Sequence, residues 1–121
     1  MLVVADAPFR LSPSPTDAEL LAKYFRVLSE PTRLGILELL AERELSVGAL
    51  VQRLGLGQSN VSNHLACLRW CGFVATRREH RTVYYRLADP RVVELVSLAR
   101  ELLAEHAERV AACRRTEGSG S

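Results

Sequence analysis

Apolar residues recur every three or four positions over most of this 121-residue chain, and that spacing predicts helices. Thr16 and Glu19 form a capping sequence at the start of the first apolar run, and Pro31 suits the first position of a second helix. Ser46 can cap a short third helix over residues 47–54. The first half of the chain is therefore expected to form three helices.

The spacing changes to alternation in the second half of the chain. The runs 73–77 and 82–87 alternate apolar and polar residues around a charged tip, which predicts a two-stranded hairpin. The helical spacing then returns over residues 90–112 and predicts one long last helix, with His106 on its apolar stripe. The expected fold class is mostly α with a small β-hairpin.

The segment before the hairpin has the layout of a helix-turn-helix. The short helix over 47–54 is followed by a turn with two glycines and by a polar helix that starts near Gln58. Gly72 can end that polar helix in the left-handed conformation. A hairpin after such a unit makes a winged helix-turn-helix, in which the polar helix would read DNA.

Length and composition favour one small domain. At 121 residues and 48% hydrophobic, the chain can bury one core but is short for two. We expect that domain over residues 16–112, after a flexible, proline-containing arm over 1–15 and before a tail over 113–121. The sequence shows neither a signal peptide nor a membrane span, which predicts a cytoplasmic protein without membrane contact.

Short polar side chains on the helix over 58–71 point to DNA recognition. At about 100° per residue, Val61, Leu65 and Leu68 share the face that can anchor the helix to a core. The opposite face carries serine and asparagine, whose side chains donate and accept hydrogen bonds and so suit phosphates and base edges. The predicted contacts on this helix are Gln58, Ser59, Asn60, Ser62, Asn63 and His64.

The distribution of charge supports this interpretation better than the total charge does. A net charge of +2 would not identify a nucleic-acid binder, but residues 76–86 hold four arginines and one glutamate. We expect Arg77, Arg78 and Arg81 to contact phosphates. The alternatives are an ordinary solvated turn, and a winged helix that serves only as a protein-interaction module.

Two of the three cysteines lie beside the predicted reading face. Cys67 and Cys71 are four residues apart, so on a helix they sit one above the other. A ligand that binds both sulfurs would touch the reading helix directly, which suggests a switch. Buried structural cysteines and a thiol redox or persulfide switch are the alternatives. This spacing leaves the two residues too far apart for an unstrained disulfide, and the odd cysteine count disfavours a secreted disulfide framework.

These motifs resemble the ArsR/SmtB family of winged-helix repressors over roughly residues 17–112. The matching blocks are LSEPTRLGIL at 28–37, SNVSNHL at 59–65 and VYYRL at 83–87. Within the family, the positions of Cys67 and Cys71 are most similar to those of the CmtR-type cadmium and lead sensors, which also use a distal cysteine that Cys113 matches. The resemblance implies a homodimer that binds operator DNA without metal and releases it when metal binds.

The chemistry of the cysteines agrees with this resemblance. Thiolates suit large, soft cations, so the expected inducer is cadmium, lead or trivalent arsenic at Cys67, Cys71 and Cys113, with no organic cofactor. The resemblance implies that the third cysteine comes from the partner subunit. His64 could be a fourth ligand, although a hydrogen bond to DNA or within the core is the favoured role.

A second type of metal site known in the family is expected to be lost. That site uses acidic and imidazole ligands on the last helix, and Arg91 and Leu102 stand where histidines would be expected. Asp89 is then better explained as a cap for the helix that follows Pro90.

Apolar residues beyond the needs of one small domain predict a homodimer. The first and last helices each carry an apolar stripe, and pairing across a twofold axis would bury both. The predicted interface residues are Leu21, Tyr24, Phe25, Leu95, Leu102 and Leu103. No Ser-His-Asp arrangement, phosphate-binding glycine loop or carboxylate pair emerges, so an enzyme is not expected.

Overall fold

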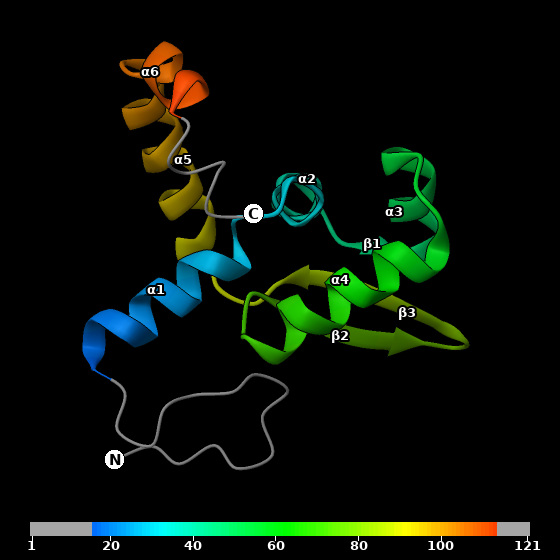
Figure 1. The fold of residues 1–121 in the computed structure, drawn as a ribbon. Coiled ribbons are helices and arrows are strands. Elements are labelled where there is room, and N and C mark those ends of the chain that lie inside the picture. The colour runs from blue at the N-terminus through cyan, green and yellow to red at the C-terminus, as the bar shows by residue number, and fades with distance from the viewer. Residues whose placement is uncertain (1–15, 114–121) are drawn as a thin grey trace.

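The structure is a computed structural model that describes residues 16–113. The predicted arm over 1–15 and the tail beyond Cys113 lie outside the described residues. The elements in chain order are α1 (Asp17–Val27), α2 (Pro31–Glu42), β1 (Leu45–Ser46), α3 (Val47–Leu54), α4 (Gln58–Trp70), β2 (Val74–Glu79), β3 (Thr82–Leu87), α5 (Arg91–Ala104) and α6 (Ala107–Ala112) (Figure 1). The predicted fold class is confirmed. No helix within residues 16–113 is long and apolar enough to cross a membrane.

Short-range hydrogen bonds explain where the helices begin. The Thr16 hydroxyl accepts a hydrogen bond from the Glu19 backbone N–H at 3.1 Å, and the Glu19 carboxylate accepts one from the Thr16 N–H at 2.7 Å. This is the predicted capping box of α1. Ser46 caps α3 by accepting from the Ala49 N–H at 3.2 Å. Gly57 offers no side chain to α4, so the first N–H groups of that helix have no side-chain cap.

The core determines which face of α4 is exposed. Val61, Leu65 and Leu68 are fully buried, as their helical spacing predicted. They pack in one cluster with side chains from the other elements, of which the largest fully buried are Ile36, Leu50 and Phe73. Because three positions of α4 are held in this cluster, the opposite face of the helix points to solvent.

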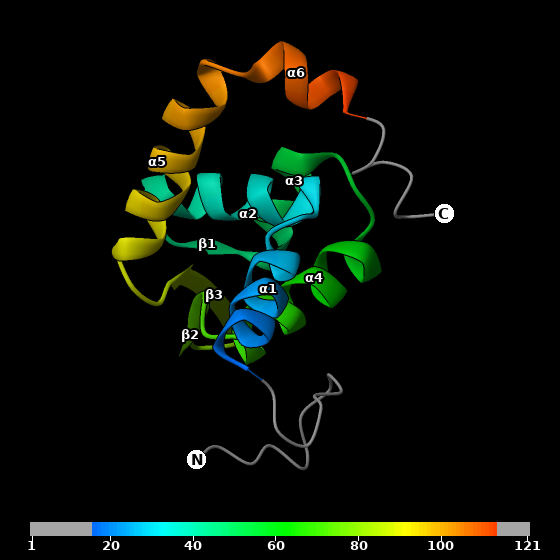
Figure 2. The same ribbon diagram turned by 60° about the vertical axis from the view of Figure 1, so that its left-hand side comes forward.

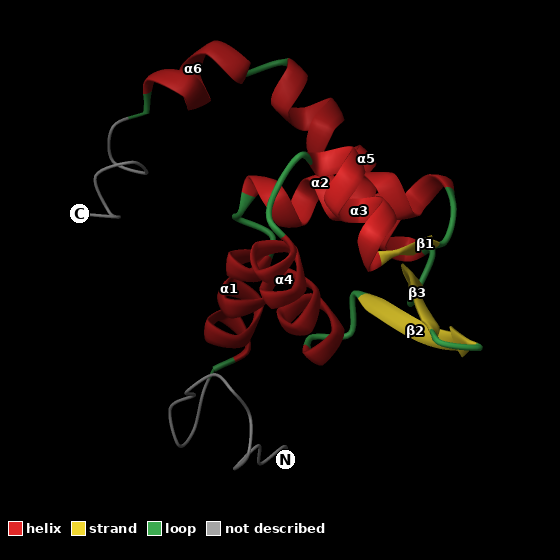
Figure 3. Cartoon of the chain, turned by 90° about the vertical axis from the view of Figure 1, so that its right-hand side faces the viewer, coloured by secondary structure: helices red, strands yellow, loops and turns green. Residues whose placement is uncertain are grey.

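The hairpin belongs to a three-stranded antiparallel sheet with the strand order β1–β3–β2. β2 and β3 form the predicted wing and extend away from the helices (Figure 3). β1 was not predicted, because it pairs with β3 through Leu45 and Ser46 alone and two residues are too few to show alternation. This short strand attaches the base of the wing to the segment after α2.

The last helix differs from the prediction of one continuous helix over 90–112. α5 ends at Ala104, and α6 starts at Ala107 and runs at a steep angle to α5 (Figure 2). The end of α5 is tightened by hydrogen bonds such as that from the His106 N–H to the Leu103 carbonyl at 2.8 Å. Residues 101–112 are all exposed, so no packing against the rest of residues 16–113 holds the helix straight. The prediction that placed His106 on a continuous apolar stripe is therefore wrong.

Candidate DNA interface and thiol pair

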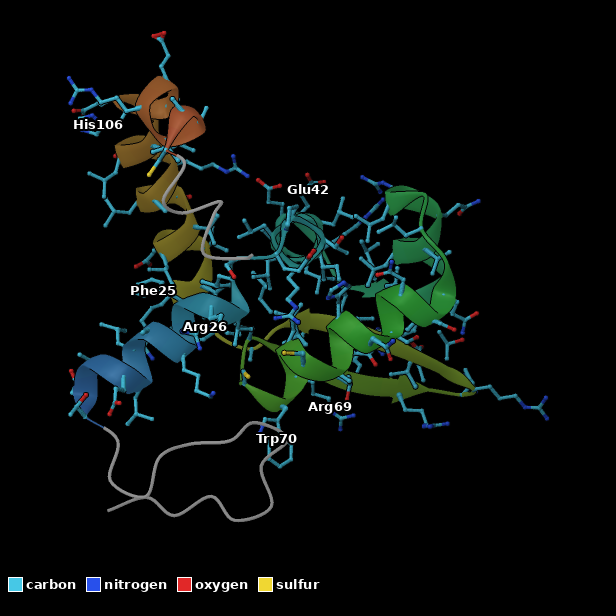
Figure 4. The ribbon with its side chains drawn as sticks, in the orientation of Figure 1. Phe25, Arg26, Glu42, Arg69, Trp70 and His106 are labelled. Atoms are coloured by element: carbon cyan, nitrogen blue, oxygen red, sulfur yellow. The ribbon has the colours of Figure 1, made fainter. Side chains whose placement is uncertain are left out.

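The predicted DNA-contacting residues of α4 lie together on its solvent side. Gln58, Ser59, Asn60 and Asn63 are exposed, and Ser62 and His64 are partly buried at the edges of this face. The uncapped N–H groups of the first turn add hydrogen-bond donors at the positive end of the helix dipole, which favour a phosphate. At the other end of α4, Trp70 is 54% exposed and points away from the described helices and strands (Figure 4).

Arg77 on the wing is held by two carboxylates. Its Nε donates to Glu44 Oε1 at 2.7 Å, and its Nη1 donates to Glu79 Oε1 at 3.0 Å. Its guanidinium also lies over the ring of Tyr84, 4.7 Å from the ring centroid. Phosphate contact by Arg77 stays a prediction that these ion pairs disfavour, because the two carboxylates already balance its charge.

Arg78 and Arg81 differ from Arg77 in having no such partners. Both are exposed, and neither forms an ion pair within residues 16–113. His80 between them has a φ of 59°, which allows the tight turn at the tip of the wing. The charges of these two arginines are therefore available to a phosphate.

Cys67 and Cys71 form a pair of reduced thiols on the flank of α4. Both are partly buried and pack against the core cluster. Burial raises the pKa of the Cys71 thiol to about 11, and the neighbouring Cys67 thiol, which hydrogen-bonds to it, acts in the same direction. Cys71 is therefore protonated at neutral pH and a weak nucleophile, which disfavours a redox role for this residue. A soft metal ion that binds here must displace its proton.

Arg33 contacts α4 and the end of α1, and the sequence interpretation missed it. Its Nε donates to His64 Nδ1 at 3.1 Å, and its Nη1 donates to the carbonyl of Val27 at 3.0 Å. The hydrogen bond to DNA or within the core that was favoured for His64 has an intramolecular counterpart here, in which Nδ1 accepts from Arg33. The positive charge of Arg33 also acts to lower the pKa of Cys71, although burial outweighs it. The only signal in the sequence was the position of Arg33 inside the block 28–37.

Cys113 is partly buried at the end of α6. Residues 16–113 assemble no group of three or more His, Cys, Asp or Glu side chains that could hold a metal ion. The three cysteines are therefore not brought together inside one described chain. The site of Cys67, Cys71 and Cys113 stays a prediction that involves a second subunit.

Asp89 binds the start of α5 as predicted, although the N-cap residue itself is Pro90. Its Oδ1 accepts a hydrogen bond from the Arg91 backbone N–H at 2.9 Å, and its Oδ2 pairs with the Arg91 guanidinium at 2.7 Å. These hydrogen bonds lower the pKa of Asp89 to about 2. The carboxylate is thus occupied by the Arg91 guanidinium.

The predicted dimer residues form an exposed apolar surface on α1 and α5. The exposed fractions are 51% for Leu21, 38% for Tyr24, 48% for Phe25, 60% for Leu102 and 43% for Leu103, and Leu95 is partly buried. Both helices lie on the side of the molecule away from α3 and from the tip of the wing (Figure 1). So many large apolar side chains together are typical of a surface that another molecule covers.

Comparison with known proteins identifies the family. Residues 30–76 match the family described as bacterial regulatory protein, arsR family. A relative from Streptomyces lividans named probable mercury resistance operon repressor is 40% identical over 105 residues, which cover 87% of this chain and 84% of the relative. This chain belongs to the arsR family. As an arsR-family member it is a transcriptional regulator, and the prediction that it is not an enzyme is confirmed.

Two further arsR-family comparisons cover most of the chain. The HTH-type transcriptional regulator CmtR of Mycobacterium tuberculosis is 42% identical over 108 residues, which cover 84% of this chain and 92% of CmtR. A solved homodimeric winged helix-turn-helix DNA-binding domain from Mycobacterium bovis, a possible ArsR-family regulator, is 35% identical with a TM-score of 0.66 over 81% of this chain and 95% of that domain. The predicted winged helix-turn-helix is confirmed.

Proposed function

We propose that this chain is a repressor that binds operator DNA as a metal-free homodimer and is released by a soft, thiophilic metal ion. The observation that carries the proposal is the position of Cys67 and Cys71 on the flank of the helix that reads DNA. One helix would then contribute to the binding of both the DNA and the metal ion.

The operator is proposed to be an inverted repeat, because a twofold dimer presents two reading helices. The exposed face of α4 would meet the groove, and Arg78 and Arg81 would meet phosphates. The residues proposed on α4 are Gln58, Ser59, Asn60, Ser62, Asn63 and His64. Arg77 would support the wing through its two carboxylate partners.

The dimer is proposed to pair α1 and α5 across the twofold axis. The support is the exposed apolar surface on these helices, together with the homodimeric relative from Mycobacterium bovis. The proposed interface residues are Leu21, Tyr24, Phe25, Leu95, Leu102 and Leu103. Covering them removes apolar area from water, which is the main favourable term in such an association.

Cys67 and Cys71 supply two sulfur ligands, and Cys113 of the partner subunit is proposed to supply the third. Sulfur ligands favour large, soft ions over hard ones, so cadmium, lead and trivalent arsenic are the candidates. The name of the Streptomyces lividans relative adds mercury, which is also thiophilic. Each thiol would give up its proton on binding.

Metal and DNA are proposed to oppose each other because they share α4. A third ligand that closes over Cys67 and Cys71 changes the orientation of α4, so the two reading helices of a dimer lose their DNA-binding positions. Coupling of this kind is typically worth roughly 1–3 kcal/mol. By reciprocity, operator DNA must weaken metal binding by the same factor.

An anaerobic titration tests this proposal. Cadmium, lead, trivalent arsenic and mercury are added singly to the protein on a fluorescent operator, and sulfur-to-metal charge-transfer absorption is recorded together with DNA anisotropy. Cys67→Ser and Cys71→Ser should bind the operator as the wild type does but ignore the metal, while Cys113→Ser should bind metal more weakly. A Cys67→Ser protein that releases DNA at the wild-type metal concentration contradicts the proposal. Release by a persulfide donor without metal would favour the redox alternative instead.

A further inference from the structure

Arg33 holds the ring of His64 from the side of α2. It lies in the first turn of α2, and its Nε donates to His64 Nδ1, in the middle of α4, at 3.1 Å. Its Nη1 donates to the Val27 carbonyl at the end of α1 at 3.0 Å. Two hydrogen bonds from one planar guanidinium fix the orientation of that group. The imidazole is therefore held by a side chain that is itself held by α1.

No carboxylate within residues 16–113 forms an ion pair with Arg33. Glu30 is the nearest acidic residue in the sequence, and its Oε1 accepts the Thr32 backbone N–H at 2.8 Å to cap α2. Both hydrogen bonds of the guanidinium go to neutral acceptors instead, one on α1 and one on α4. This arrangement fixes the position of the acceptors rather than balancing a charge.

The bond at Nδ1 leaves the other ring nitrogen of His64 as a donor. Because Nδ1 accepts from Arg33, the neutral imidazole carries its hydrogen on Nε2. Within residues 16–113, Nε2 forms no hydrogen bond, and no buried side-chain nitrogen or oxygen lacks a partner, so Nε2 reaches solvent. The Nε2–H group lies on the side of the ring away from Arg33.

This free N–H group belongs to the edge of the face that is proposed to read DNA. At about 100° per residue, His64 lies between the buried side of α4 and the side that carries Asn60 and Asn63. Both asparagines are exposed, and His64 is partly buried. An N–H donor at this edge suits a phosphate oxygen or an acceptor on a base.

We propose that Arg33 is a positioning residue for DNA recognition, which holds the His64 ring so that its Nε2–H donates to an acceptor of the operator. The inference rests on the proposed function, and it adds the atom that makes the contact and the side chain that orients it. A ring held in one orientation and one tautomer loses little freedom when DNA binds. Without Arg33, the ring can turn and change its tautomer, and the entropy cost of ordering it offsets part of the hydrogen bond.

The first test needs no variant. In the metal-free wild-type dimer labelled with nitrogen-15 arginine and histidine, a scalar coupling across the hydrogen bond should connect Arg33 Nε with His64 Nδ1. The hydrogen of the ring should be on Nε2 alone, and it should exchange with water more slowly when the operator is bound. A ring that shows both tautomers in the free protein, or an Nε2–H whose exchange the operator leaves unchanged, overturns the inference.

The second test is a double-mutant cycle for operator binding. Arg33→Lys keeps the charge, but one ammonium cannot replace the guanidinium fork that reaches both His64 and Val27. Arg33→Lys and His64→Ala should each weaken operator binding at least about fivefold, as expected for the loss of one hydrogen bond per subunit. In the His64→Ala background, Arg33→Lys should have almost no further effect, because it acts through that ring.

Arg26→Lys is the matched control, at an exposed arginine in the last turn of α1 (Figure 4). It should bind the operator as the wild type does. Additive effects of Arg33→Lys and His64→Ala overturn the inference, because a structural role of Arg33 at Val27 alone would weaken binding whether or not His64 is present. Wild-type affinity in either single variant overturns it as well.

An unrelated duplex of the same length identifies the acceptor. Equal weakening of both duplexes by His64→Ala indicates a phosphate oxygen, and weakening of the operator alone indicates a base edge.

Failure of the inference is distinguishable from failure of the proposed function. If the wild type prefers its operator but the cycle is additive, the inference is wrong and the proposed repressor stands. If the wild-type dimer binds no inverted repeat more tightly than the unrelated duplex, the proposed function fails and the inference fails with it.

Discussion

Two neighbouring arginines on the wing should respond differently when their charge is removed. Arg78 is exposed and has no ion pair among residues 16–113, so it can displace counterions from a phosphate. Arg77 lies 2.7 Å from Glu44 and 3.0 Å from Glu79, and its charge is already balanced within the protein. Arg78→Gln should therefore reduce the salt dependence of DNA binding, and Arg77→Gln should leave it almost unchanged.

The expected change in the salt dependence of DNA binding follows from counterion release. Each phosphate contact contributes about 0.9 to the slope of log affinity against log salt, and a homodimer has two copies of Arg78, so Arg78→Gln should flatten the slope by about 1.8. Between about 50 and 200 mM salt, this difference amounts to about 12-fold in relative affinity. Arg77→Gln should change the slope by less than about 0.4.

Fluorescence anisotropy of a labelled operator over this salt range measures the slope of log affinity against log salt for each variant. An unrelated duplex of the same length is the control. Arg78→Gln should weaken both duplexes to the same degree, because phosphates carry no sequence information. An unchanged slope in Arg78→Gln would refute the phosphate contact. Equal flattening by Arg77→Gln would show that Arg77 leaves Glu44 and Glu79 to meet the DNA.

Three further substitutions test the dimer, the core and the thiols. Leu103→Glu places a charge on the exposed apolar face of α5, so sedimentation should show a monomer without specific operator binding, and a retained dimer would mean that the interface lies elsewhere. Leu65→Ala should lower the free energy of unfolding in urea by about 2–5 kcal/mol, because Leu65 is fully buried beneath the reading face. The pKa of Cys71 is raised from 9.0 to about 11, so its contribution to the stability of the metal-free protein is present below pH 9 and is lost as the pH rises through 11. The wild type should therefore lose more stability than Cys71→Ser between these two pH values, and an equal loss would contradict the raised pKa.

The sequence by itself determined the local features of this fold. The capping box at Thr16 and the Ser46 cap of α3 were predicted because each depends on a side chain and an N–H group three residues away. Gly72 adopts a φ of 85° after α4, as expected of a glycine that follows a helix. The burial of Leu65 and its partners followed from helical spacing alone, and so did the exposure of the opposite face, which is proposed to read DNA.

Only the tertiary structure decided the contacts that connect these elements. Arg33 and His64 are 31 residues apart, and Arg77 and Glu44 are 33 apart, so no periodicity in the sequence brings either pair together. The end of α5 was also missed, since residues 101–112 keep an apolar spacing but are all exposed in the part of the chain that the structure describes. A cap or a helical stripe depends on neighbours within one or two turns. An ion pair or a helix break depends on how the core orients the segments that carry it, and that orientation exists only in the folded chain.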